Sequence, residues 1–259
     1  MRETWMLIKL SWKSQMIYRL DFFGNLALLF WSYGLQYIFF SEVFQYTNHL
    51  AGWSEVQTFV VFSILIFITL SVETVGRSIL EFFRVLHRGN IDPFLLKPIP
   101  ISKLLWLRWC RPVNIIPLML WTAISVNHRL FKEVNELAGG YQGLLVLAFL
   151  IGLAILANIC FMTLVSLMTF VIQRELPVDY IHEQVFRLAI LPVTVYSRVG
   201  SCFMSVILPV AVSGAVPLII VMNSDYGLGF AFSLGCLGLM AVTWVSIHYS
   251  LSKFDGTGG

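Results

Sequence analysis

Residues 79–98 read ILEFFRVLHRGNIDPFLLKP and form the longest polar interruption early in a chain that is otherwise mostly apolar. The pattern predicts two helices joined at a sharp corner. The first helix ends near Arg88, a cation that the helix dipole favours in a last turn, and Gly89 follows where a left-handed C-cap residue is needed. Asp92 before Pro93 starts the second helix, because a residue before proline leaves the α region and proline fits the first helical position.

The second helix is short, because Pro98 and Pro100 end it. It therefore carries three bulky apolar side chains on one or two turns, Phe94, Leu95 and Leu96, and basic residues flank it: Arg84, Arg88, Lys97 and Lys103. Such side chains need a surface to bury against. Two interpretations stay open, a helix that rests on lipid headgroups and a helix that docks into a groove of a soluble partner.

The composition predicts an integral membrane protein. The chain has 259 residues, of which 58% are hydrophobic and 12% charged, and its mean hydropathy is +0.81, values far from those of a soluble domain. A net charge of only +3 does not point to nucleic acid. The four cysteines are widely separated, with no pair at metal-ligand spacing, and we interpret them as reduced packing residues.

Hydropathy and helical periodicity predict six membrane spans after an N-terminal interfacial helix. Residues 2–21 place Trp5 and Trp12 along one stripe and lysines elsewhere, which is typical of a helix that lies at the headgroups. Runs of roughly 20 apolar residues can each cross about 30 Å of hydrocarbon. The expected spans are 22–40, 56–72, 104–126 with kinks at Pro112 and Pro117, 143–172, a fifth within 173–223, and 226–251.

The basic residues indicate the orientation. On one side of the membrane the predicted short loops hold only Arg129 and Lys132, whereas the other side, which includes the corner, holds many more basic residues. Arg187 and Arg198 are not counted, because their side depends on the fifth span. The positive-inside rule therefore places both termini and the corner in the cytoplasm. The residues on that side are Arg2, Lys9, Lys13, Arg19, the cluster from Arg77 to Arg111, Arg174 and Lys253.

The corner resembles the cytoplasmic coupling loop of ABC-2 type transporter permeases, in particular of their six-span subunits. The residues that carry the resemblance are Gly89, Asp92, Leu95, Leu96, Lys97 and Pro98. Asn90 departs from the pattern, since the family often has a charged residue there. The helix over 2–21 is also similar to the N-terminal connecting helix of the family.

The resemblance implies an all-α polytopic membrane protein with a cytoplasmic coupling region over 79–103, which we name the elbow. It implies a permease subunit of the bacterial cytoplasmic membrane that pairs as a homodimer or with a sister permease above two ABC ATPase subunits, which bind ATP and magnesium. Leu95 and Leu96 would be docking anchors beside Phe94, Asp92 a helix cap after Gly89, and a charged rim would comprise Arg84, Arg88 and Lys97.

Hydropathy and the resemblance differ over residues 173–223. Hydropathy alone predicts a cytoplasmic stretch over 173–198 and a fifth span over 199–222. The resemblance implies a fifth span after Glu175, a turn near Pro192 and Tyr196, and a re-entrant hairpin over 190–223 that contains Pro209 and Pro217. We favour the hairpin, because prolines at this spacing suit one straight helix poorly. It places His182, Glu183 and Arg187 within the membrane, where they must pair or face water.

The sequence contains no G-x-x-x-x-G-K-[ST] loop, so we expect ATP hydrolysis on a partner and no catalysis in this chain. Asn158, in the fourth span, is expected to make a helix-to-helix hydrogen bond, with contact to the transported substrate as the alternative. The mostly aromatic and aliphatic interior favours an amphipathic, lipid-linked or drug-like cargo. An ion-coupled carrier and a membrane scaffold or assembly factor stay open as other classes.

Overall fold

The computed structural model describes residues 2–17, 19–50, 52–89, 92–95, 99–127, 129–172, 176–190 and 197–252, and all of its long elements are helices. The first half contains α1 (Arg2–Ile17), α2 (Arg19–Tyr46), α3 (Glu55–His87), α4 (Asp92–Leu95), α5 (Ile101–Leu107), η1 (Pro112–Asn114) and α6 (Ile115–Asn127). The second half contains α7 (Arg129–Leu137), α8 (Tyr141–Ile172), α9 (Val178–Arg187), η2 (Leu188–Ile190), α10 (Arg198–Ile207), η4 (Pro209–Val212), α11 (Ala215–Asn223) and α12 (Tyr226–Ser252).

Three helices in the described part are long and apolar enough to cross a membrane. They cover Glu55–Leu86, Tyr141–Thr169 and Tyr226–Ser250, with 32, 29 and 25 residues, and a shorter apolar helix covers Pro112–Ala123. At 1.5 Å per residue, even the shortest of the three exceeds the ~30 Å of a hydrocarbon core. The chain is therefore built around long apolar helices, as its composition predicts, and the count of six spans stays a prediction.

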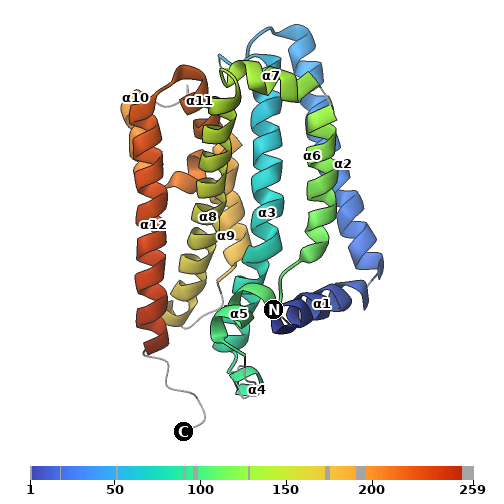
Figure 1. Ribbon diagram of the computed structural model, residues 1–259, viewed down its shortest axis with the longest axis vertical. Helices are drawn as coiled ribbons and strands as arrows, with labels where there is room; N and C mark the ends of the chain where they lie inside the picture. The colour runs from blue at the N-terminus through green and yellow to red at the C-terminus, as the bar shows by residue number, and fades with distance from the viewer. Residues whose placement is uncertain are drawn as a thin grey trace.

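These long helices stand side by side, with α6, α9 and the segment from α10 to α11 along them, whereas α1, α4, α5 and α7 lie at the two ends of the bundle (Figure 1). One end carries α1, α4 and α5 together with the last turns of α3 and α12; we name it the elbow end. The opposite end, named the far end, carries α7 and the start of α8. The basic helices α1 and α5 thus lie at one end, whereas Arg129 and Lys132 belong to α7 at the other.

The core lies where α3 and α8 cross. Ile68 and Leu70 of α3 are fully buried, and so are Ala154 and Ala157 of α8, whose small side chains let the two helices approach closely. Helix α12 closes the other side of α8 with the fully buried Phe232. The last turns of α3 belong to the elbow. The elbow is therefore a continuation of a helix that is buried in the core.

A capping box starts α3 at the far end. The backbone N–H of Gln57 donates to Ser54 Oγ at 3.4 Å, and the N–H of Ser54 donates to the Gln57 side chain at 3.0 Å. These bonds satisfy two of the backbone groups that a helix start leaves without partners. The helix then runs unbroken for 33 residues to the elbow.

The structure differs from the sequence prediction at the third span, at the turn that follows it and at the N-terminal helix. The predicted kinked helix over 104–126 is two helices, α5 and α6, with a non-helical break over 108–111 before Pro112 begins η1. Proline lacks the N–H that would continue α5, and it suits the first turn of a new helix. The predicted turn over 127–142 contains α7, and the helix predicted over 2–21 ends at Ile17.

Residues 198–223 form a hairpin of short helices instead of the single helix that hydropathy predicts over 199–222. Helices α10 and α11 have 10 and 9 residues, so each spans only about 15 Å. Between them lies η4, which begins at the buried Pro209; Pro217 lies in the first turn of α11, where its missing N–H costs no hydrogen bond. Pro192 and Tyr196 lie outside the described residues.

Two glycine contacts place this hairpin inside the bundle. A side chain at Gly214, at its tip, would meet Leu65 of α3 and the carbonyl oxygen of Ala189. Gly235 of α12 lies directly against the backbone of Ser205 and Val206 in α10. The tip is therefore enclosed by α3, η2 and α12, and the backbone of α10 touches α12 because position 235 has no side chain.

Replacing Gly235 by alanine is expected to lower the free energy of unfolding by about 1–3 kcal/mol, because the added methyl group overlaps the backbone of Ser205 and Val206. The measurement is the thermal unfolding midpoint of the purified chain in lipid nanodiscs. Gly238→Ala is the matched control on the same helix, since nothing lies within 4 Å of its added atom. Equal midpoints for both variants would contradict the close packing of α10 on α12.

Candidate functional site

The corner after α3 has the backbone conformation that the sequence predicts. Helix α3 ends at His87, and the N–H of Arg88 donates back to the carbonyl of Arg84 at 3.1 Å. Gly89 has φ +70°, and its N–H donates to the carbonyl of Leu86 at 3.1 Å. This left-handed conformation is the one that glycine adopts without strain, so Gly89 turns the chain away from the helix axis. The short helix α4 follows.

Phe94, one of the three predicted docking side chains, packs within the chain. Its ring centroid lies 5.2 Å from that of Trp109, and the guanidinium of Arg108 lies 5.8 Å from the Phe94 ring and 5.4 Å from the Trp109 ring. Cation–π contacts of this length are attractive and tie α4 to the segment after α5. Leu95 belongs to α4, whereas Leu96, Lys97 and Pro98 lie outside the described residues, as do the side chains of Asp92 and Leu95.

The break over 108–111 is held by α3 on one side. The N–H of Trp109 donates to Ser78 Oγ at 3.1 Å, and the N–H of Arg111 donates to the carbonyl of Thr74 at 2.9 Å. Ser78 is fully buried. A break in a helix frees backbone donors that are costly to bury without partners, and here two of them bond to α3.

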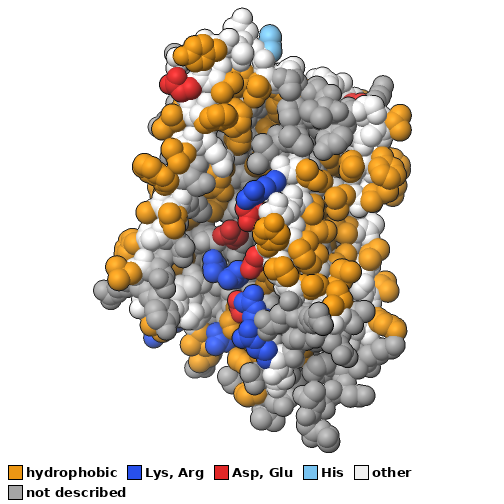
Figure 2. Space-filling model, turned by 180° about the vertical axis from the view of Figure 1, so that it is seen from behind, with side chains coloured by type: hydrophobic (Ala, Val, Ile, Leu, Met, Phe, Trp, Pro, Cys, Tyr) orange, Lys and Arg blue, Asp and Glu red, His pale blue; other side chains and the backbone are white. Residues whose placement is uncertain are grey.

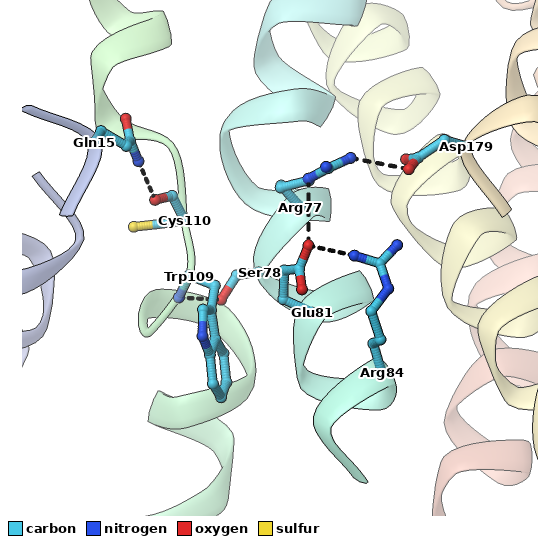
Figure 3. A network of polar contacts seen from close by, with 8 residues as sticks. All are labelled: Gln15, Arg77, Ser78, Glu81, Arg84, Trp109, Cys110 and Asp179. Atoms are coloured by element: carbon cyan, nitrogen blue, oxygen red, sulfur yellow. Dashed lines mark hydrogen bonds and ion pairs between the residues drawn. The ribbon is translucent and has the colours of Figure 1, made fainter. Parts of the chain in front are cut away.

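Helix α1 holds the same break on its other side. Ser11 Oγ lies within hydrogen-bond distance of the carbonyl oxygens of Leu107 and Arg108, at 3.0 and 2.7 Å, and Gln15 donates from Nε2 to the carbonyl of Cys110 at 2.8 Å. We name Ser11 and Gln15 with these carbonyls the clasp. Figure 3 shows the Gln15 bond on one side of the break and the Ser78 bond on the other.

Ion pairs continue from the elbow along α3 and across to α9. Arg84 pairs with Glu81 at 2.6 Å, and Arg77 lies 3.7 Å from the same carboxylate and 2.9 Å from Asp179 of α9 (Figure 3). Arg84, predicted as part of a charged rim around the docking helix, thus belongs to a network inside the chain. The Arg77–Asp179 pair connects the helix that leads into the elbow with a helix about a hundred residues further along the sequence.

More charged groups extend this network toward the far end. On α9, Arg187 pairs with Glu183 at 2.7 Å, and on α3 Glu73 accepts a hydrogen bond of 3.4 Å from Asn114. Figure 2 shows acidic and basic side chains gathered in a narrow vertical stripe on an otherwise apolar face. We name it the charged stripe; its members are Glu73, Arg77, Glu81, Arg84, Asp179, Glu183 and Arg187.

Asn158 makes the helix-to-helix hydrogen bond that the sequence favours. It is fully buried near the middle of α8, donates to the carbonyl of Ala154 at 2.8 Å, and its Oδ1 lies 3.0 Å from Nε2 of His182. The ring of His182 stacks on Phe186 with centroids 5.7 Å apart. This contact fixes α9 at the level of the middle of α8.

The structure divides the predicted site residues into two groups. Arg84, Arg88, Gly89, Phe94 and the backbone of Asp92 and Leu95 lie at the elbow, whereas Asn158, Pro209 and Pro217 lie in the bundle. Sequence reasoning missed Ser11, Gln15 and Ser78, because a serine inside a helix usually bonds to its own helix and one glutamine in a polar helix is no signal. It also missed Thr74, whose contribution is a backbone carbonyl and therefore does not depend on residue type. No group of His, Cys, Asp and Glu with metal-site geometry occurs among the described residues.

Comparison with known families agrees with this geometry. The family model described as ABC-2 family transporter protein matches residues 30–258, so the chain belongs to the ABC-2 transporter family. A search of curated proteins and a search of solved structures found no match. The family predicted from the sequence is thereby confirmed, and the docking role of the elbow stays a prediction.

Family membership defines the class of protein. The chain is a multi-pass membrane protein and a permease subunit of an ABC transporter, a class that associates with ABC ATPase partners. In this class ATP hydrolysis resides on the separate ATPase subunit. The elbow and the charged stripe are therefore features of a permease.

Replacing Ser78 by alanine is expected to lower the free energy of unfolding by about 1–3 kcal/mol, because it leaves the N–H of Trp109 without its acceptor. Thermal unfolding of the chain in nanodiscs measures the effect. Ser63→Ala is the control on the same helix, since Ser63 donates only to the carbonyl of Phe59 within α3. A loss at Ser63 as large as that at Ser78 would show that the bond across to Trp109 contributes nothing of its own.

Proposed function

We propose that this chain is the transmembrane subunit of an ATP-driven exporter. Two copies, or one copy and a sister permease, would stand above two ATPase subunits that bind ATP and magnesium. The proposal places the assembly in the bacterial cytoplasmic membrane and the elbow in the cytoplasm. The observation that carries it is the charged stripe, which begins at the elbow and reaches the middle of the bundle on an exposed face.

The depth of the stripe supports a polar path. Helix α9 rises from Asp179, beside Arg77, toward the far end, and His182 lies level with Asn158 in the middle of α8. The Glu183–Arg187 pair therefore lies near mid-bundle, yet its side chains are 59% and 63% exposed. A charged pair at that depth is too costly to face hydrocarbon, so this face is expected to border water.

The distribution of charge supports the orientation. The basic residues of α1 and the elbow lie at one end of the bundle, and α7 with Arg129 and Lys132 lies at the other. The positive-inside rule assigns the more basic end to the cytoplasm. Both termini then lie inside, on the side where an ATPase must dock.

The hairpin of α10 and α11 supports a re-entrant element that opens to the far side. Its tip is buried against Leu65 and Ala189, and α12 starts directly after it at Tyr226. Non-helical backbone such as that of Leu208, with φ −135° and ψ 65°, is tolerated at membrane depth where protein surrounds it. An outward opening beside a polar stripe and an apolar core suits an amphipathic, lipid-linked or drug-like cargo.

The mechanism follows from how α3 is built. Closure of the ATPase pair would push on α4, and α3 would carry the movement as a rigid helix from the elbow to the far end. Because the Arg77–Asp179 pair joins α3 to α9, the movement would shift the two sides of the charged stripe against each other. The polar path between the paired permeases would open outward as a result.

Leu95→Asp is expected to release the ATPase, because a carboxylate on α4 opposes burial in an apolar groove. The measurement is the amount of ATP-binding subunit, identified by its phosphate-binding loop, that purifies with the tagged chain. Leu95→Met is the matched control and should retain the subunit. Unchanged association in the aspartate variant would reject the docking role, and transport by the chain without any ATPase would favour an ion-coupled carrier.

The variants Glu183→Cys and Arg187→Cys are expected to react with a charged, membrane-impermeant methanethiosulfonate reagent in intact membranes, because the charged stripe is proposed to border water. Leu237→Cys on α12 is the matched control, since Leu237 is 54% exposed but belongs to an apolar face. The measurement is the labelling rate of each variant, with the native cysteines replaced. Rates as low as that of Leu237→Cys would mean that lipid or protein covers this face and that the polar path lies elsewhere.

A further inference from the structure

The link between α1 and the elbow is polar and specific. Helix α1 precedes α2 in the chain and is separated from the elbow by two long helices in sequence, yet it contacts α5 and η1. Leu7 is buried in this contact, and Ser11, one turn further along α1, is 1% exposed. Ser11 and Gln15 lie four residues apart, so both face the break over 108–111 from one side of α1.

The break offers its backbone to two helices at once. The carbonyl oxygens of Arg108 and Cys110 lie within hydrogen-bond distance of Ser11 and Gln15 on α1, as does that of Leu107 at the end of α5, and the N–H groups of Trp109 and Arg111 donate to α3. If α5 continued into α6, the helix itself would use these N–H groups as donors and one lone pair of each carbonyl oxygen, so the N–H groups would not be available to α3. The break is thus what allows one short segment to bond to both α1 and α3.

The same segment also holds α4. The Trp109 ring packs against that of Phe94 in a tilted arrangement, and the Arg108 guanidinium lies over both rings. A displacement of α4 is therefore transmitted to residues 108–111 through these side chains, in addition to the covalent path back into α3. From residues 108–111 the clasp is the polar route to α1.

We infer that the clasp transmits movement of the elbow to α1 and so to α2, in addition to the direct movement of α3. Ser11 and Gln15 are then positioning residues for the movement of α1 and α2. The inference rests on the proposed function, because it needs an ATPase that moves the elbow. Helix α1 ends at Ile17 and α2 begins at Arg19, so a rotation of α1 changes the angle at which α2 enters the bundle. The elbow thus drives α3 directly and α2 through the clasp.

The experiment uses the permease–ATPase complex in lipid nanodiscs and compares hydrogen–deuterium exchange without nucleotide and after trapping with MgATP and vanadate. Peptides from 2–17 report on α1, and peptides from 79–95 report on the elbow. In the wild-type complex, both sets are expected to change exchange on trapping. In Ser11→Ala/Gln15→Leu, the elbow response should remain and the α1 response should be lost.

Two further variants separate this role from a general effect on folding. Ser14→Ala removes a hydrogen bond that stays within α1, to the carbonyl of Ser11, and should leave the α1 response intact. Ser11→Thr, in a chain that keeps Gln15, retains a hydroxyl at the clasp. Its α1 response should therefore be present, in contrast to that of Ser11→Ala/Gln15→Leu. Both comparisons are made at matched thermal stability of the complexes.

The results that overturn the inference are distinct from those that overturn the proposed function. An α1 response that survives Ser11→Ala/Gln15→Leu would show that apolar packing at Leu7 carries the movement, and the clasp role would be wrong. A wild-type complex in which the elbow responds and α1 does not would show that no movement reaches α1, and it would also reject the clasp role. An elbow that does not respond to trapped nucleotide would reject the proposed ATP-driven function, and this inference with it.

Discussion

The structure depends on one constraint, that backbone hydrogen-bonding groups need partners wherever the chain leaves a helix inside an apolar bundle. Each unsatisfied group costs several kcal/mol in hydrocarbon. The break over 108–111 meets this constraint with side chains of α1 and α3, so the chain can turn there without continuing α5. The requirement that makes the break expensive also ties three helices together at the elbow end.

The charged stripe obeys the same logic for side chains. Its arginines and carboxylates are paired along α3 and across to α9, which lowers the cost of placing them beside apolar helices. The Glu183–Arg187 pair is the exception in one respect, because it is well exposed near mid-bundle. Pairing alone does not explain that exposure, whereas the polar path that we propose along this face would.

The hairpin depends on small residues at two close contacts. A side chain at Gly214 would overlap Leu65 and the carbonyl oxygen of Ala189, and one at Gly235 would overlap the backbone of α10. Pro209 begins the turn between the two short helices. Hydropathy reads α10 to α11 as one apolar run, since window averages are blind to a reversal of direction. The signs of that reversal in the sequence were the spacing of the prolines and the family resemblance.

The sequence by itself determined the class, the long apolar helices and the corner at Gly89, because hydrophobic length, glycine conformation and the family pattern are properties of local residues. Only the tertiary structure decided that Phe94 packs on Trp109, that Arg84 joins a network to α9, and that Ser11, Gln15 and Ser78 hold the break. These contacts join residues that are from about 15 to about 100 positions apart in the sequence, through hydrogen bonds, ion pairs or ring contacts. Such pairings leave no periodicity in the sequence, because they depend on where helices lie and not on what each helix is made of.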